Sequence, residues 1–176
     1  EASRKLGFQA RRTMKVAQEL YEGVEVADMG AVGLITYMRT DSLRISEDAV
    51  KEAADYILER WGKKYLPDTP RKFKVKANAQ DGHEAIRPTY MENQSVEGTA
   101  QEKKLYDLIW KRTIASQMAD AELEKTTATI SISKSDDVFT AIGEVIKFDG
   151  FLRVYRESYD DENEQEDESR LLPPLK

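Results

Sequence analysis

The sequence predicts an α+β fold, in which a mainly helical region is followed by antiparallel β-strands. Apolar residues recur about every 3.6 positions in three segments between residues 9 and 120. Between residues 126 and 155 the period changes to two, which is the spacing of side chains on one face of a strand. The change of period therefore predicts a boundary between Asp120 and Glu122.

Each helical segment also carries signals for its ends. Residues 9–23 can stop at Gly23, and their apolar stripe comprises Met14, Ala17, Leu20 and Tyr21. Residues 45–66 can be capped by Ser46, and their expected buried face comprises Val50, Ala53, Ala54, Ile57, Leu58 and Trp61. Residues 96–120 place Thr99 and Glu102 as in a capping box, ahead of Leu105, Leu108, Ile109 and Arg112 at helical spacing.

The stretch GLITYMRTDS, residues 33–42, predicts a strand. In a strand, side chains two apart share a face, so Ile35, Tyr37, Arg39 and Asp41 would project together. Residues 24–32 before it are expected to form a glycine-containing loop, and residues 67–82 a basic loop punctuated by prolines.

Residues 126–155 predict two or three strands, with turns at Asp136–Asp137 and Asp149–Gly150. Beyond residue 155 the chain lacks a buried pattern, and residues 157–168 hold eight acids without a base. The remainder up to residue 176 is therefore expected to be an acidic mobile loop with a truncated end.

Composition narrows the possible functions of the 176-residue chain. There is no cysteine, which excludes disulfides and thiolate metal sites, and no apolar run long enough to span a membrane. The net charge of −6 comes from the acids after residue 156, because elsewhere bases outnumber acids. Bases gather near the N-terminus and between Arg60 and Lys76, which suggests phosphate binding or simply a solvated face. No P-loop is present, so nothing suggests ATP hydrolysis.

Tyr37 and Arg39 are candidates for phosphoryl transfer. A tyrosine hydroxyl with a pKa near 10 is a poor nucleophile, but a neighbouring cation lowers that pKa and neutralises an attacked phosphate. A guanidinium also matches phosphate oxygens bidentately. The spacing alone equally fits an ordinary strand with an exposed arginine.

His83 is the single histidine of the chain and lies in DGHEAIRPT. One histidine does not build a multi-histidine metal site, but it can bond a phosphate or move a proton near pH 7. Arg87 would share its face if the segment were helical, although Pro88 argues against a helix there. Glu84 could orient His83 or be solvated, and a turn histidine without chemistry remains the plain alternative.

Two motifs together resemble one family. GLITYMRTDS and NAQDGHEAIRPT, residues 33–42 and 78–89, are similar to the signature segments of bacterial type IA DNA topoisomerases. The flanks EASRKLGF, RRTMKVAQELYEG, LYDLIWKRTIASQM and FDGF agree in order, so the resemblance covers essentially the whole chain. The family often has Thr where this chain has Leu43, and Ala where it has Gly82; neither change removes a reactive group.

The resemblance implies roles for individual residues. Tyr37 would attack a DNA phosphate and form a 5′-phosphotyrosyl bond, which is later resealed without ATP, so that negatively supercoiled DNA relaxes. Arg39 would stabilise the transition state, and His83 would contact the scissile region or assist proton transfer. The residues expected to bind DNA are Arg87, Thr36, Asp41, Ser42, Lys72 and Lys74.

The resemblance also implies the organisation of the chain. Residues 1–121 would form the mainly helical, winged-helix-like tyrosine domain, residues 122–156 strands of the adjoining arch domain, and residues 157–176 the acidic end. The chain would be a fragment without a cofactor of its own, because Mg²⁺ and a catalytic Glu and Lys belong to a Toprim domain that nothing here matches. It would then be inactive alone. The expected partners are single-stranded DNA and the parent's other domains, in a cytoplasmic, nucleoid-associated, monomeric enzyme without membrane contact.

Two alternatives of other classes remain open. Short helices, a strand and basic loops could build a non-catalytic winged-helix-like module that binds DNA. A protein-interaction domain could use the apolar strand faces and the acidic end. A salt titration distinguishes the two alternatives. The DNA affinity of a DNA-binding module falls as the salt concentration rises, whereas a protein-interaction domain is expected to show no salt-dependent DNA affinity.

Overall fold

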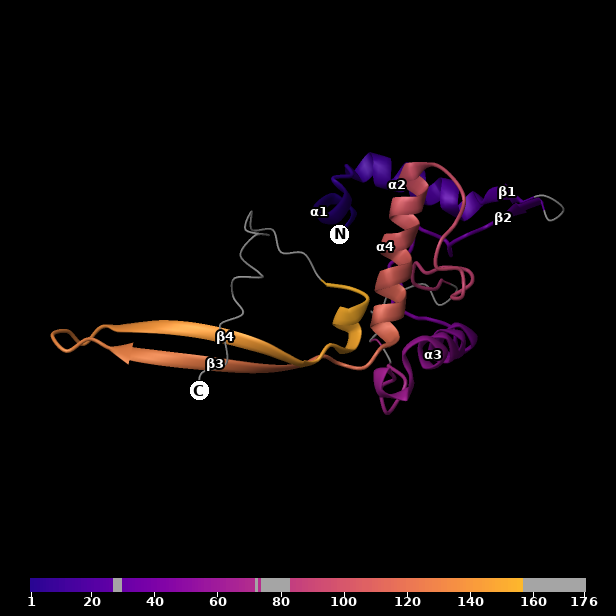
Figure 1. The fold of residues 1–176 in the computed structure, drawn as a ribbon. Coiled ribbons are helices and arrows are strands. Elements are labelled where there is room, and N and C mark those ends of the chain that lie inside the picture. Colours follow the sequence, from indigo (N-terminus) through magenta and orange to yellow (C-terminus); the bar gives the residue numbers. More distant parts are fainter. Residues whose placement is uncertain (27–29, 72, 74–82, 157–176) are drawn as a thin grey trace.

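A helical body carries a long two-stranded ribbon that projects away from it in the computed structural model (Figure 1). The structure describes residues 1–26, 30–71, 73 and 83–156. The α+β fold class predicted from the sequence is confirmed, with helices α1 to α4 first and the paired strands β3 and β4 after them. Among the described residues, no helix has both the length and the apolar character that crossing a bilayer requires.

Helix α4, Ala100–Gln117, is the centre of the body, with the other helices around it (Figure 1). It is buried on most of its circumference, because bulky side chains follow one another on several faces: Leu105, Tyr106, Leu108, Trp110 and Ile114. Two of these also bond a neighbouring loop, since the Trp110 indole donates to Met91 O at 2.9 Å and the Tyr106 hydroxyl to Asn93 O at 2.6 Å. Burial, with the Glu52 charge, raises the pKa of Tyr106 to about 12.

Helices α1 (Ala2–Leu6), α2 (Ala10–Glu22) and α3 (Glu47–Trp61) pack against α4. The helices predicted over residues 9–23 and 45–66 are confirmed as α2 and α3, including Ser46 as the N-cap that accepts from Ala49 N, whereas α1 was not predicted. Leu58 was wrongly placed in the buried face of α3, because 48 % of it is exposed. The buried stripe instead runs through Ala49, Ala53 and Ile57 at intervals of four, which leaves Leu58 beside it.

The predicted capping box of α4 is present in full. Thr99 Oγ1 accepts from Glu102 N, and the Glu102 carboxylate accepts from Thr99 N. We expect Thr99→Ala to lower the free energy of unfolding by about 1 kcal/mol, because one helix-end N–H loses its partner. Chemical denaturation measures this, with Lys104→Ala on the exposed side of α4 as the control. Equal stability of the two variants would contradict the cap's contribution.

Residues 24–26 and 30–32 form two short paired strands where a loop was predicted. Strands β1 (Val24–Val26) and β2 (Gly30–Val32) pair antiparallel, with Val24 opposite Val32. Three-residue strands are too short to show an alternating pattern, so periodicity missed them. The chain enters the hairpin at Gly23, where φ is +94° and a Cβ would lie 2.1 Å from Val32 O.

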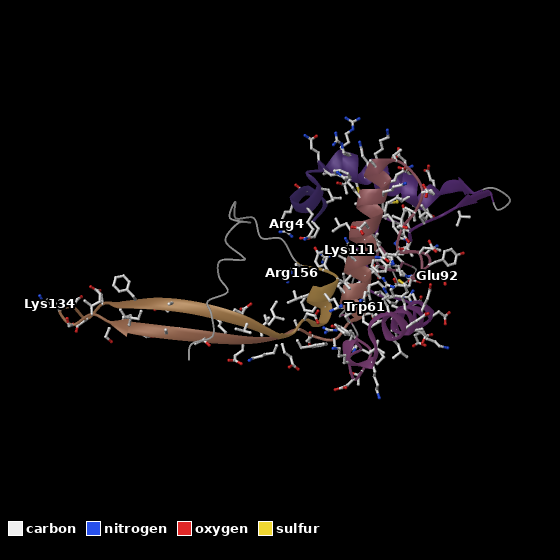
Figure 2. All side chains as sticks on the ribbon, in the orientation of Figure 1. Arg4, Trp61, Glu92, Lys111, Lys134 and Arg156 are labelled. Carbon is white, nitrogen blue, oxygen red and sulfur yellow. The ribbon has the colours of Figure 1, made fainter. Side chains whose placement is uncertain are left out.

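The ribbon consists of β3 (Glu122–Ser131) and β4 (Val138–Phe148), paired antiparallel. Its side chains face solvent on both surfaces, with Lys134 at its far end (Figure 2). Apolar residues are among them: Leu123, Ile130, Val138, Phe139, Ile142 and Ile146. The turn predicted at Asp136–Asp137 lies between the strands. Since an isolated two-stranded ribbon is marginal in water, this surface suits a larger sheet.

The sequence left open a third strand after the turn at Asp149–Gly150, and the described residues contain none there. The chain instead turns into a short 3-10 helix, η2, Gly150–Arg153. Gly150, at φ +48°, lies so close to the backbone of Asp120 that a Cβ would be 2.4 Å from its carbonyl oxygen. This contact turns the chain back onto the helical body, where Tyr65 OH donates to Asp149 Oδ1 at 2.7 Å and fixes the base of the ribbon.

Candidate functional site

The two sequence motifs lie side by side in the structure. Ile35 pairs with Pro88 in an isolated bridge, flanked by hydrogen bonds from Thr36 N to Arg87 O and from Thr89 N to Leu34 O, both 2.9 Å. The strand predicted over residues 33–42 was therefore wrong, and one bridge replaces it. Leu34 N instead donates to Leu20 O and Arg87 N to the Thr36 hydroxyl, so a regular ladder does not continue on either side of the bridge.

Thr36 joins the motifs through its side chain as well. Its hydroxyl donates to Ala85 O at 2.7 Å and accepts from Arg87 N at 3.0 Å. On the other side of the segment, Thr89 Oγ1 donates to Gly33 O at 2.7 Å. These bonds fix the backbone immediately before Tyr37. The Thr36 hydroxyl is thus engaged inside the protein, and its expected contact with DNA would compete with these partners.

The exposure of residues 37–42 still alternates, as it would in a strand. Tyr37, Arg39 and Asp41 are exposed, whereas Met38 and Ser42 are buried. This exposure pattern fits the shared orientation proposed for the phenol, the guanidinium and the carboxylate, which stays a prediction. Ile35 departs from it, because it is 2 % exposed and belongs to the core.

The Tyr37 ring lies between two other rings. The Tyr21 ring from α2 contacts it edge-on, with centroids 5.4 Å apart and planes at 68°. The His83 ring lies at 5.4 Å and 57°. The structure thus places the His83 ring against the Tyr37 ring. Residues 83–87 are not helical, so His83 and Arg87 do not share a helical face there. Tyr21 was read only as part of the apolar stripe of α2, and periodicity gave no sign of this contact.

Beside these rings is a small surface recess of about 190 Å³. Its lining includes Tyr37, Arg39 and Tyr21, together with Gln18, Glu22 and Met38. Among the described residues, neither the Tyr37 hydroxyl nor the Arg39 guanidinium has a hydrogen-bond or ion-pair partner. A phenol and a guanidinium therefore line the same open space, and attack on a phosphate would need two such groups close together.

Arg87 is held inside the protein rather than presented to solvent. Its Nε donates to Glu84 Oε2 at 2.8 Å and its Nη1 to Pro88 O at 2.9 Å. Glu84 also accepts from Ser46 N, so it orients Arg87 and the start of α3 rather than His83. Burial alone would raise the pKa of Glu84, but the hydrogen bond and charge of Arg87, with the Ser46 N–H, hold that pKa below its usual value.

The other residues expected to bind DNA differ in their surroundings. Asp41 is exposed, whereas Ser42 is buried and its hydroxyl accepts from Arg44 N at 3.2 Å. Lys72 and Lys74 lie outside the described residues. Within the described ranges, no three His, Cys, Asp or Glu side chains gather in a way that could hold a metal ion.

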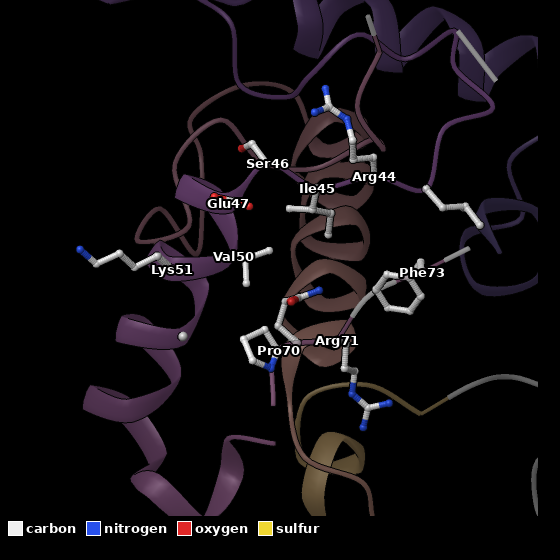
Figure 3. A pocket seen from close by; sticks show the side chains of 12 residues that line it. Arg44, Ile45, Ser46, Glu47, Val50, Lys51, Pro70, Arg71 and Phe73 are labelled. Carbon is white, nitrogen blue, oxygen red and sulfur yellow. The ribbon is translucent and has the colours of Figure 1, made fainter. Parts of the chain in front are cut away.

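A larger hollow, about 650 Å³, lies elsewhere, between α3 and the chain at Pro70 and Arg71 (Figure 3). Its lining is mainly apolar, with Ile45, Val50 and Phe73 facing the opening. Arg71 at its edge is already paired with Asp120 at 2.6 Å. None of Tyr37, Arg39 and His83 lines it, so size does not mark the site where the reactive groups converge.

Comparison with known proteins shows the family to which the chain belongs. A family model described as DNA topoisomerase matches residues 1–176. DNA topoisomerase 1 of Rickettsia bellii is 50 % identical over 181 residues, and that of Xylella fastidiosa 46 % over 189 residues. Each match covers 100 % of this chain but 22 % of the relative. The full-length topoisomerase I structure from Thermotoga maritima matches 91 % of this chain and 26 % of its own, with 38 % identity and a TM-score of 0.75. The chain therefore belongs to the DNA topoisomerase family.

Proposed function

We propose that this chain is the tyrosine-bearing part of a type IA DNA topoisomerase, which cleaves one DNA strand and reseals it. The observation that carries the proposal is that Tyr37 and Arg39, neither of which bonds a described residue through its polar end, line one recess, with the His83 ring against the Tyr37 ring. The family membership of the chain supports it. Single-stranded DNA is the proposed substrate, which would place the parent protein with the nucleoid of the cell.

The proposed reaction is a reversible transesterification. The Tyr37 oxygen loses its proton and bonds to the phosphorus of a backbone phosphate, while the bond from phosphorus to the 3′ oxygen breaks. That oxygen takes up a proton and leaves as a 3′-hydroxyl, and the DNA stays linked to Tyr37 through its 5′ phosphate. Attack of the 3′-hydroxyl on the phosphotyrosine reverses each step. One phosphoester replaces another, so resealing needs no ATP.

Two neighbouring side chains have proposed roles in this exchange. Arg39 neutralises the charge that accumulates on the phosphate oxygens, because a guanidinium remains charged and matches two oxygens at once. His83, whose ring touches the Tyr37 ring, is placed to accept or return a proton near the reacting oxygen. Arg87 contributes indirectly, since its bonds hold the segment between His83 and Pro88.

The rest of the enzyme is proposed to lie outside this chain. Residues 1–121 would form the tyrosine domain, residues 122–156 the first strands of an arch domain, and residues 157–176 an acidic connection. The exposed apolar residues on both faces of the ribbon support its inclusion in a larger sheet. Opening of that arch would let a second strand pass through the break.

In this proposal, a magnesium ion would be bound by the Toprim domain of the parent protein. When bound there, it would supply charge neutralisation at the phosphate. The described residues of this chain do not fit such a site, because they bring no three suitable ligands together. The isolated chain is therefore expected to bind DNA weakly without cleaving it.

The experiment that tests the function traps the covalent intermediate. The full-length protein is incubated with 5′-unlabelled, 3′-labelled single-stranded DNA, denatured with SDS and digested with trypsin. Mass spectrometry is expected to find the label on a peptide containing Tyr37. A label on any other residue would overturn the assignment. DNA binding without an adduct would favour the alternative, a non-catalytic DNA-binding module.

The exposed face of α2 offers a phosphate-binding surface. Arg11, Arg12 and Lys15 line a recess of about 490 Å³, in which Glu19 is the single acidic residue. We expect the triple change to glutamine to weaken single-stranded DNA binding and to lower the slope of log affinity against log salt by about 0.7 per cation that contacts a phosphate. Fluorescence anisotropy at several salt concentrations measures the slope.

The control for this surface is Lys134→Gln, at the far end of the ribbon (Figure 2). It removes a cation that is remote from α2, and it should leave the salt slope unchanged. A triple variant that also keeps the wild-type slope would show that this face of α2 does not contact phosphate.

A further inference from the structure

We infer that Tyr21 is a positioning residue that holds the ring of the nucleophile Tyr37 from the end of α2. The inference rests on the proposed function, because it concerns the alignment of Tyr37 with a DNA phosphate. It starts from the edge-on contact of the two rings, 5.4 Å between centroids at 68°. This is the geometry that aromatic pairs favour, because the positive edge of one ring meets the negative face of the other.

Tyr21 stands on a firmly anchored support. It follows Leu20, which is fully buried in the core, and it lies in the last turn of a 13-residue helix. The helix end is bonded directly to the segment that carries Tyr37, since Leu34 N donates to Leu20 O at 2.9 Å. Gly33 lies against the same turn, where a Cβ would be 2.8 Å from Tyr21 O. The backbone segments that carry the two tyrosines are therefore joined directly.

Tyr37 needs such a contact, because its own side chain is little constrained. Its backbone is held by the bonds of Thr36, but 38 % of the residue is exposed, and among the described residues nothing bonds its hydroxyl. In the described structure, ring contacts with Tyr21 and His83 limit the rotation of the Tyr37 side chain. Correct orientation of a nucleophile accounts for a large part of a rate enhancement, and small misplacements are costly.

The ring of Tyr21, rather than its hydroxyl, carries the effect. The residue is 41 % exposed, and no described residue accepts or donates a hydrogen bond at its hydroxyl. Tyr21→Phe keeps the ring edge and is expected to keep the activity. Tyr21→Leu keeps an apolar side chain on the helix but removes the aromatic edge, so Tyr37 would sample more orientations.

The test measures single-turnover adduct formation by the full-length protein at saturating single-stranded DNA. Tyr21→Leu is expected to lower this rate about tenfold, with the DNA dissociation constant and the Tm close to wild type. Tyr21→Phe should restore the rate to within about twofold. Met14→Ala is the matched control, because Met14 lies on the same helix and is 42 % exposed, yet it does not line the recess beside Tyr37.

Three outcomes are distinguishable. A wild-type rate for Tyr21→Leu would overturn the positioning role while leaving the proposed function intact. A loss in Tyr21→Phe as large as in Tyr21→Leu would also overturn it, because the hydroxyl would then matter. Absence of any adduct in the wild-type protein would refute the proposed function itself, on which the inference depends.

Discussion

Tyr37→Phe in the full-length protein is expected to abolish relaxation of negatively supercoiled DNA. The substitution removes one oxygen, which is the atom proposed to bond phosphorus. The neighbouring Tyr21 contacts Tyr37 through its ring, and its hydroxyl is not expected to replace the missing nucleophile. Loss of a nucleophile costs an enzyme on the order of 10⁶-fold, which places relaxation below detection.

The structure predicts that this variant folds normally. Among the described residues the Tyr37 hydroxyl makes no hydrogen bond, so its removal leaves no buried group without a partner. Both ring contacts remain, because phenylalanine keeps the aromatic ring. Relaxation by gel electrophoresis, single-stranded DNA binding and Tm together check the prediction. Relaxation that survives, in a variant with wild-type Tm and DNA binding, would remove Tyr37 from the mechanism.

The helices were predictable because their signals are local. The capping box of Thr99 and Glu102 and the stripe of Ala53 and Ile57 each lie within one segment, and the structure contains both. The error at Leu58 shows the limit of this reasoning, since an apolar residue at the edge of a stripe can face either way. Tertiary packing decides such positions, and a single sequence does not contain the neighbours.

The site was predictable in its residues but not in its geometry. Tyr37 and His83 were selected by two motifs, and the structure places their rings in contact although 46 positions separate them. The strand expected around Tyr37 did not form, because the N–H groups of Leu34 and Arg87, which would continue the ladder, are bonded to Leu20 O and to the Thr36 hydroxyl. The contact between Tyr21 and Tyr37 was also missed, because it too depends on tertiary structure. The one signal in the sequence was the position of Tyr21, an aromatic residue at the edge of an apolar stripe in the last helical turn before the motif.

Arg39→Ala is expected to slow cleavage by about 10²- to 10³-fold, which is typical for loss of one group that stabilises a transition-state charge. The side chain is exposed and lines the same recess as Tyr37. Since no described residue pairs with its guanidinium, the full charge is available to a phosphate. The same absence predicts little change in stability, because no internal bond is lost. Quenched-flow measurement of adduct formation, with DNA binding measured separately, tests both statements.

Arg39→Lys separates charge from geometry at the same position. Lysine keeps the positive charge but replaces the planar fork with a point charge, so two parallel bonds to phosphate oxygens become one. We expect a rate between those of wild type and Arg39→Ala, about 10-fold below wild type, and a DNA affinity close to wild type. Arg60→Ala, at the exposed end of α3, controls for removal of a surface arginine. If Arg39→Lys matched wild type in both cleavage and resealing, charge alone would suffice and the bidentate contact would be excluded; if Arg39→Ala also matched it, the guanidinium would have no part in the transition state.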